Sequence, residues 1–276
     1  MAEPEQKPAH LEPSKLGTKE YWDNLYNREL TNHADNPADE GTVWFDDSDA
    51  ENKIVSYLDE SASSEFNLNP STAKVLDLGC GNGSLLFALR DDGWEGQLLG
   101  VDYSEKSVEL ARQVGLARAA QDNNSDDGEQ EKTKEEGVLG SVTFKVWDVL
   151  NGNLSDIASD PFPPIPAETE KEGQWDLVLD KGTFDAVSLS AERDSQGRRI
   201  FEGYGERVLR LLRTGGIFLV TSCNWTETEL QKWFEGSNPS GPARLRMAGR
   251  IDYPSFSFGG VKGQTISTLC FEKVII

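Results

Sequence analysis

Largely apolar runs alternate with helical apolar patterns along most of this chain. Such runs predict buried parallel strands, and five of them lie at 75–78, 97–101, 142–147, 175–179 and 217–222. Between the runs, apolar residues recur every three or four positions, as in Val108, Ala111 and Val114, which is the spacing of a helix that packs one face on a sheet. Two β-rich runs, 243–253 and 266–276, close the chain. The alternation predicts an α/β fold with an antiparallel pair near its C-terminal end.

Capping and turn residues predict where several other elements begin and end. Thr18 is expected to cap a helix over the aromatic residues of 21–26, and a polar loop is expected at 31–42. Leu212 falls on the apolar face of a later predicted helix, which Gly215 and Gly216 are expected to end before the strand at 217–222.

Composition divides the chain into three expected parts. Residues 1–14 are rich in Pro and Glu and predict a disordered tail, and 15–73 form an N-terminal helical segment that is expected to act as a lid and substrate segment. The α/β domain is expected at 74–276. It contains an acidic insertion at about 119–137 that is expected to be disordered, and a Pro-rich irregular loop at 160–173.

The most informative turn follows the first predicted strand. Asp77 lies near the end of this strand, and glycines follow at alternate positions, 79, 81 and 83. Glycines at a strand-to-helix turn let the backbone approach a ligand closely, because no Cβ stands in the way. The third glycine comes one position too early for a dinucleotide fingerprint. The carboxylate beside the loop would repel a phosphate, whereas it suits a cationic ligand.

Three later strands each end in an aspartate. Asp102 follows the second strand, Asp148 the third and Asp180 the fourth. The carboxyl ends of parallel strands meet at one edge of an open α/β sheet, and this is the edge that binds ligands. Asp102 lies about 20 residues after the glycine turn, where such folds place a carboxylate for ribose hydroxyls.

The pattern Asp-x-Gly-x-Gly-x-Gly at 77–83 resembles the first motif of class I S-adenosylmethionine-dependent methyltransferases, whose cofactor has an ammonium and a sulfonium group and no phosphate. The resemblance implies S-adenosylmethionine as cofactor, and a Rossmann-like fold with a seven-stranded, mostly parallel sheet and helices on both faces. It also implies that Asp148 accepts a hydrogen bond from the adenine amino group. The residues assigned to cofactor binding are Asp77, Gly79, Cys80, Gly81, Asn82, Gly83, Asp102, Tyr103, Trp147 and Asp148.

A second motif, Asp180-Lys181-Gly182-Thr183-Phe184-Asp185-Ala186, resembles the signature of the seven-strand protein-lysine methyltransferases that modify translation elongation factor 1A. The segment Ser14–Asp23 and the tripeptide Val43-Trp44-Phe45 are similar to one branch of them, the elongation factor 1A lysine methyltransferase 4 group, also called methyltransferase-like protein 10. The resemblance covers nearly the whole chain from Ser14 onward, apart from the two irregular stretches. It implies lysine methylation of elongation factor 1A, which is then the expected protein partner.

Other methyl acceptors leave different marks after the fourth strand. Enzymes that methylate the amino groups of adenine or glutamine carry two prolines and an aromatic residue there, and this chain has Asp180-Lys181-Gly182-Thr183 instead. Cytosine C5 chemistry needs a nucleophilic Cys in a Pro-Cys context, which the chain lacks. A flexible aliphatic amine is therefore the favoured acceptor.

Asp180 is the candidate catalytic residue, expected to orient the incoming amine and to pass its proton outward. Because a facing carboxylate raises the pKa of an amine, no dedicated general base is assigned. The alternative is a structural residue at the strand end that caps Thr183 or pairs with Lys181. The expected walls of the lysine channel are Trp22, Trp44, Phe45, Lys181, Thr183 and Phe184, although Trp22 and Trp44 could equally pack the N-terminal helix.

Charge and composition narrow the classes of partner. The formal net charge is −21 and the sequence pI is about 4.5, so a nucleic-acid partner would lose its electrostatic driving force while a basic protein would be attracted. Three cysteines and two histidines predict neither a disulfide framework nor a metal site. The first residues resemble no signal peptide, and no run reaches the ~18 apolar residues of a membrane span. We expect a cytoplasmic monomer.

Two functions of other classes stay open at this point. The chain could be a small-molecule amine or carboxylate methyltransferase, which a comparison of protein and metabolite extracts as acceptors would reveal. It could also be a non-catalytic module that has kept the cofactor fold, although Asp77, Asp102, Asp148 and Asp180 are all in place.

Overall fold

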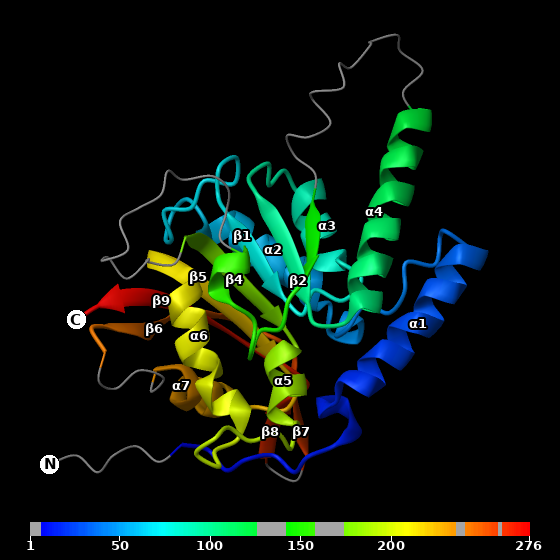
Figure 1. Cartoon of the computed structure of the whole chain (residues 1–276). Coiled ribbons are helices and arrows are strands. Elements are labelled where there is room, and N and C mark those ends of the chain that lie inside the picture. Colours follow the sequence, from blue (N-terminus) through cyan, green and yellow to red (C-terminus); the bar gives the residue numbers. More distant parts are fainter. Residues whose placement is uncertain (1–6, 126–141, 158–173, 236–240, 259–260) are drawn as a thin grey trace, which may run out of the picture. The chain divides into compact units, whose positions relative to one another are not determined.

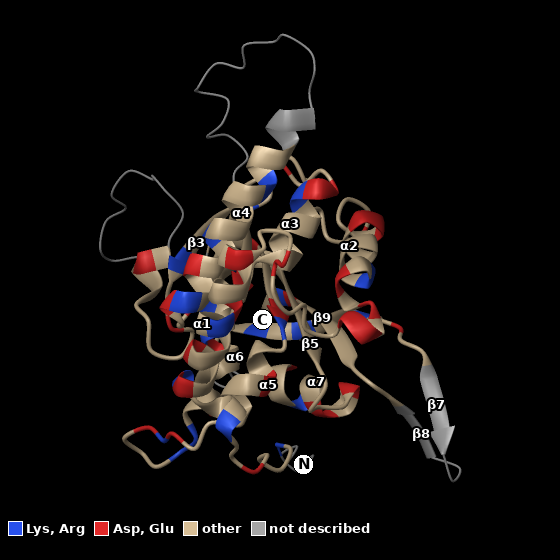
Figure 2. Ribbon diagram, turned by 90° about the vertical axis from the view of Figure 1, so that its right-hand side faces the viewer, with Lys and Arg blue, Asp and Glu red and all other residues tan. Residues whose placement is uncertain are grey.

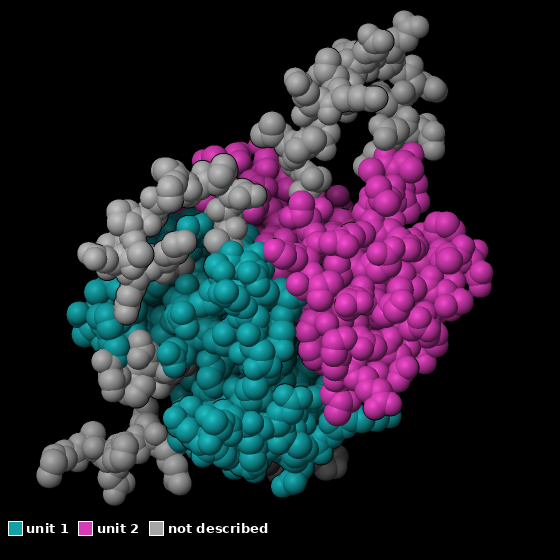
Figure 3. Space-filling model, in the orientation of Figure 1, with its two compact units in different colours: residues 1–17, 147–276 teal, residues 18–146 magenta. Residues whose placement is uncertain are grey.

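The computed structural model describes residues 7–125, 142–157, 174–235, 241–258 and 261–276. The chain divides into two compact units, one of residues 1–17 and 147–276 and the other of residues 18–146 (Figure 3). This division does not follow the boundary at residue 73 that composition suggested. The two units are described in turn.

Seven strands form one sheet, in the order β3-β2-β1-β4-β5-β9-β6 (Figure 1). Strands β1, β2 and β3 pair in parallel, as do β4 and β5, whereas β9 runs antiparallel to both β5 and β6. The expected mostly parallel sheet with a C-terminal antiparallel pair is confirmed. The strands are β1 (Val75–Leu78), β2 (Leu98–Asp102), β3 (Thr143–Val146), β4 (Trp175–Lys181), β5 (Leu212–Ser222), β6 (Ala243–Ile251) and β9 (Ser267–Ile275).

The unit of residues 18–146 holds the glycine turn and the N-terminal helices. Its helices are α1 (Lys19–Asp35), the short 3-10 helix η2 (Asp46–Ser48), α2 (Ala50–Ser61), α3 (Ser84–Asp91) and α4 (Glu105–Ser125). Helix α1 packs against α4 (Figure 1) and carries both acidic and basic side chains (Figure 2). The predicted cap is confirmed, because the Thr18 side chain accepts a hydrogen bond from the backbone N–H of Tyr21 at 3.4 Å.

Two predicted boundaries in this unit are wrong. Helix α1 continues to Asp35, so the loop expected at 31–42 begins later; buried Glu29 and His33, one helical turn apart, extend the inward face of the helix. Helix α4 continues through Ser125, so the insertion expected from residue 119 does not begin there. Ala119 and Ala120 favour helix intrinsically, and this preference carries the helix into polar sequence. The rest of the expected insertion lies outside the described residues.

The second unit surrounds β4, β5, β9 and β6 with short helices. These are η1 (Lys15–Gly17), η3 (Leu154–Ile157), α5 (Thr183–Ser188), η4 (Ile200–Gly203), α6 (Tyr204–Leu211) and α7 (Glu227–Glu235). A two-stranded hairpin of β7 (Ser255–Phe258) and β8 (Val261–Gln264) was not predicted. The expected Pro-rich loop at 160–173 lies outside the described residues.

Two strands of this unit are longer than their apolar runs suggested. Leu212 begins β5 opposite Trp175 instead of ending the preceding helix, and the register then shifts so that Leu177 pairs with Ile217. Gly215 has a φ of 72° within this shift, so the glycine pair serves a bulge inside a strand and not a helix end. Strand β4 extends to Lys181, which puts Asp180 inside the strand.

The residues before η1 were expected to be disordered, but residues 7–14 of that tail contact the second unit. Ser14 donates its backbone N–H to the carbonyl of Leu189 at 3.1 Å, and Arg199 donates to the carbonyl of Leu11 at 3.3 Å. The His10 ring stacks on Trp233 with centroids 5.9 Å apart. An exposed aromatic surface therefore orders a segment that has almost no apolar residues of its own.

Candidate active site

The glycine turn after β1 has the backbone that its sequence predicts. Gly79, Gly81 and Gly83 have φ values of 67°, 57° and 83°, a region that residues with a Cβ rarely adopt. The backbone N–H groups of Gly79 and Cys80 donate to the carbonyl of Val101 at 2.7 and 3.0 Å, which ties the turn to β2. Cys80 is buried, and burial raises the pKa of its thiol well above the usual range. Its thiol is therefore neutral and packs.

Asp102 lies beside this turn at the end of β2. One carboxylate oxygen accepts the backbone N–H of Ser104 at 2.9 Å and the other accepts that of Gly81 at 3.3 Å. The Ser104 hydroxyl in turn donates to the carboxylate of Asp23 on α1 at 2.6 Å. Lys19, also on α1, places its ammonium 5.7 Å from the ring centroid of Tyr103. Helix α1 is thus bonded directly to the loop that carries the expected ribose ligand.

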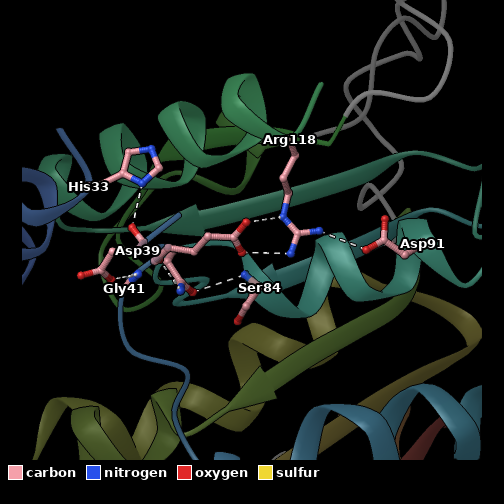
Figure 4. A network of polar contacts seen from close by, with 8 residues as sticks. His33, Asp39, Gly41, Ser84, Asp91 and Arg118 are labelled. Atoms are coloured by element: carbon pink, nitrogen blue, oxygen red, sulfur yellow. Dashed lines mark hydrogen bonds and ion pairs between the residues drawn. The ribbon is translucent and has the colours of Figure 1, made fainter. Parts of the chain in front are cut away.

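A polar network fixes the loop between α1 and α2 against the glycine turn (Figure 4). Asn82 donates from its side chain to the carbonyl of Glu40 at 2.9 Å and accepts the backbone N–H of Ser84 at 3.3 Å. The Glu40 carboxylate receives two hydrogen bonds from the Arg118 guanidinium, both 2.9 Å. Arg118 also pairs with Asp91 at 3.0 Å.

Trp22 and Trp44, both expected to line the lysine channel, lie together in this unit. Their rings meet edge to face with centroids 5.4 Å apart, and Trp22 also stacks on Tyr26 at 6.3 Å. Both tryptophans are half-buried. Phe45 has a φ of 66°, an unusual conformation for a bulky residue, and its carbonyl accepts from Ser48 and Ala50.

The groups around the turn fit a cationic ligand. Asp77, Asp102 and Glu29 are 3%, 7% and 5% exposed, so three carboxylates are withdrawn from water around one turn and helix. Burial raises the pKa of Asp102 although Ser104 and Gly81 donate to it. One oxygen of Glu29 has no hydrogen-bond partner among the described residues. A bound cation would offset the cost of burying such carboxylates.

In the other unit, Trp147 and Asp148 belong to a tight loop after β3. The indole N–H of Trp147 donates to the carbonyl of Asn153 at 3.0 Å. The Asp148 carboxylate accepts the backbone N–H groups of Leu150 at 2.8 Å and Asn151 at 3.2 Å, so it already closes its own turn. The Arg207 guanidinium lies 5.4 Å from the Trp147 ring centroid and donates to two carbonyls of the loop.

Asp180 is fully buried, and its carboxylate is bonded by its own neighbours. It accepts the backbone N–H of Thr183 at 2.8 Å, that of Phe184 at 3.0 Å and the hydroxyl of Tyr204 at 2.5 Å. Burial raises the pKa of Asp180 to about 7 despite these donors. The structural alternative, a carboxylate that caps Thr183, describes these bonds. A direct contact between Asp180 and the amine stays a prediction.

The same motif holds a second buried carboxylate, which the sequence did not single out. Asp185 accepts the hydroxyl of Ser222 at 2.5 Å and the backbone N–H of Cys223 at 2.8 Å, so it links α5 to the end of β5. Phe184, expected in the channel, is 1% exposed and lies among other aromatic rings, including Phe234 at 4.9 Å. Lys181 and Thr183 are partly exposed at the end of β4 and the start of α5.

The structure therefore brings the expected cofactor residues of one unit together around the glycine turn, with Trp22 and Trp44 in the same unit. Trp147, Asp148 and the Asp180 motif belong to the other unit. Sequence reasoning missed Asp23 and Glu40, whose partners lie about 80 residues away along the chain. Asp23 does stand in the N-terminal segment that carried the resemblance, and this was the available signal.

Comparison with known proteins identifies the family. Residues 69–260 match the family described as "Methyltransferase domain". The chain is 39% identical to "Protein-lysine N-methyltransferase EFM4" of Saccharomyces cerevisiae over 97% of this chain and 99% of that one. It is 37% identical to "Protein-lysine N-methyltransferase efm4" of Schizosaccharomyces pombe, over 95% of each chain. It is also 30% identical to human "EEF1A lysine methyltransferase 2", over 95% of this chain and 88% of that one.

A solved structure of magnesium protoporphyrin IX methyltransferase (ChlM) from Synechocystis PCC 6803 with bound SAM is 14% identical. It covers 92% of this chain and 96% of that one with a TM-score of 0.49, and at that level it adds nothing to the assignment. The assignment rests on the relatives that match almost end to end. By these matches, the chain belongs to the family of protein-lysine N-methyltransferases.

Proposed function

We propose that the protein transfers the methyl group of S-adenosylmethionine to a lysine side chain of translation elongation factor 1A. The observation that carries the proposal is the near full-length match to relatives from yeast to human, of which the vertebrate ones are named for EEF1A. The net charge of −21 favours the encounter with a basic protein. We place the reaction in the cytoplasm, where this substrate acts, and infer a monomeric enzyme.

The glycine turn and its carboxylates are the proposed cofactor site. S-adenosylmethionine, when bound, supplies a methyl group activated by a sulfonium. Asp102 has the burial and the position at the end of β2 to bind ribose hydroxyls, and buried Asp77 favours the cationic groups of the ligand. Gly79, Gly81 and Gly83 let the backbone come close, because a side chain there would occupy the same space.

The acceptor nitrogen must be neutral, although a free lysine titrates near ~10.4. A channel that excludes water lowers this pKa, and the half-buried pair Trp22–Trp44 is suited to hold the aliphatic stem. In the proposed transfer the nitrogen forms a bond to the methyl carbon as the carbon–sulfur bond breaks, and the methylated amine then loses a proton to water. We infer that Asp180 positions the start of α5, because its oxygens hold Thr183 and Phe184.

Incubation of purified elongation factor 1A with labelled S-adenosylmethionine tests the proposal. We expect label on methyl-lysine after acid hydrolysis, and its loss when one lysine of the substrate is changed to Arg. Label on histidine, on glutamine or on a chain terminus would contradict lysine transfer. Label on small metabolites but not on protein would favour a small-molecule methyltransferase.

Gly81→Arg is the control variant of the enzyme. A Cβ at Gly81 would stand 2.8 Å from the Tyr26 hydroxyl, and the φ of 57° disfavours any side chain. This variant should bind no cofactor and transfer no label. Transfer at the wild-type rate would remove the glycine turn from the proposed site.

A further inference from the structure

The inward face of α1 brings a phenol against the glycine turn. Tyr26 is 5% exposed, and its hydroxyl oxygen lies 2.8 Å from the point where Gly81 would carry a Cβ. Since Gly81 has none, the hydroxyl is at the backbone of the turn itself. The sequence placed Tyr26 on the packed side of a helix and gave it no part in the site.

The Tyr26 hydroxyl forms no hydrogen bond with any described residue. One helical turn further along α1, an oxygen of Glu29 is also buried without a partner among these residues. Buried polar groups are nearly always hydrogen-bonded in folded proteins. A phenol and a carboxylate left open on one helix face, both toward the glycine turn and its adjoining loop, indicate a ligand that completes them.

The surroundings keep this phenol protonated. Burial, and then the nearby carboxylates of Asp102 and Glu29, raise the pKa of Tyr26 well above its usual value of 10.0. At neutral pH the hydroxyl can therefore donate a hydrogen bond. A donor in this position seeks an acceptor, and a carboxylate is the strongest acceptor that a zwitterionic ligand offers.

The helix that carries the phenol is fixed in place. Asp23, three residues before Tyr26, accepts the Ser104 hydroxyl at 2.6 Å, and the backbone N–H of Ser104 donates to Asp102 at 2.9 Å. Trp22 stacks on the Tyr26 ring with centroids 6.3 Å apart. The hydroxyl is thus held at Gly81 before any ligand binds, which lowers the entropic cost of the contact.

We propose that Tyr26 is a further cofactor-binding residue, whose hydroxyl donates a hydrogen bond to the carboxylate at the amino-acid end of S-adenosylmethionine beside Gly81. This inference rests on the proposed function. The ribose hydroxyls are themselves donors and are matched by the acceptor oxygens of Asp102, so the remaining strong acceptor of the ligand is its carboxylate. Buried Asp77 and Glu29 then serve its cationic groups.

Tyr26→Phe tests the inference, with Tyr21→Phe as the matched control on the same helix. Tyr21 is partly exposed and packs edge to face on Trp22, away from any stated contact with the turn. Calorimetry would compare S-adenosylhomocysteine with its decarboxylated analogue, which keeps the ammonium and lacks only the carboxylate. We expect Tyr26→Phe to weaken S-adenosylhomocysteine about three- to tenfold and to leave the decarboxylated analogue unchanged. Tyr21→Phe should change neither.

Several results would overturn the inference. Equal losses for both ligands would mean that the hydroxyl serves another part of the cofactor, and unchanged affinity for both would mean that it does not bind the cofactor. The melting temperature of the ligand-free Tyr26→Phe protein should not fall, because the removed hydroxyl has no described protein partner. A lowered melting temperature or a failure to fold would assign it a structural bond. Wild-type protein that binds no S-adenosylhomocysteine would refute the proposed function instead.

Discussion

Replacing Asp180 by Asn should change how the stability of this protein depends on pH. The carboxylate is fully buried, and burial raises its pKa to about 7. Asn keeps the shape of the side chain. Its oxygen can accept the backbone N–H groups of Thr183 and Phe184, and its amide can donate to the Tyr204 oxygen. The variant therefore removes the ionisation and leaves the bonding pattern nearly intact.

The sign and size of the effect follow from the two pKa values. The folded protein holds the proton of Asp180 up to about pH 7, whereas the unfolded chain loses it near the model value of 3.8. Between these values the folded state binds more protons, so the free energy of unfolding falls as the pH rises. The difference of about 3 units corresponds to about 4 kcal/mol in all, at about 1.4 kcal/mol for each unit. About 3 kcal/mol of this develops between about pH 5 and about pH 8.

Urea unfolding followed by tryptophan fluorescence, at several pH values across this window, measures the effect. Subtracting the Asp180→Asn values from the wild-type values cancels the groups that titrate alike in both proteins. The difference should move against the wild type by about 3 kcal/mol as the pH rises. A constant difference would show that Asp180 ionises as it does in the unfolded chain. A change of opposite sign would show that the three donors outweigh the cost of burial.

Three other substitutions test separate parts of the structure. Asp102→Ala should weaken S-adenosylhomocysteine binding by about 1–3 kcal/mol in calorimetry, through the loss of charge-assisted hydrogen bonds; unchanged affinity would refute the ribose assignment. Gly17→Ala should lower the free energy of unfolding by about 1–3 kcal/mol in urea, because its Cβ would collide with the backbone of Leu189; a neutral result would show that this segment can shift. Glu40→Gln should cost at most on the order of 1 kcal/mol, because the pair with Arg118 is partly exposed, and a larger loss would contradict that exposure.

The sheet could be read from the sequence because each buried strand left a short apolar run. The glycine turn could be read too, since positive φ values at 79, 81 and 83 leave little choice but glycine. Boundaries failed where local pattern and tertiary contacts disagreed. Leu212 continues the apolar spacing of the helix before it, yet its backbone pairs with Trp175 in the sheet. A helical spacing cannot reveal that the next residue has already entered a strand.

The site was harder to read than the fold, because its bonds join residues far apart in sequence. The aspartate at the end of each strand was visible, but what each carboxylate bonds was not. Asp180 and Asp148 both close turns formed by the residues that follow them, a use that a strand-end aspartate shares with any ligand-binding role. Asp185 stood in plain view inside the motif, and only the fold shows that it holds Ser222 and Cys223.

The N-terminal segment carried much of the resemblance although it lies outside the α/β repeat, and its contacts give a physical reason. Gly17 is required because the backbone of Leu189 occupies the space of a Cβ, and Thr18 is required to start α1. Asp23 then bonds Ser104, whose own N–H orients Asp102. Each position answers to a different partner, so a substitution at one cannot be offset by its neighbours along the chain. A segment constrained in this way distinguishes one branch of methyltransferases better than a glycine turn that the whole superfamily shares.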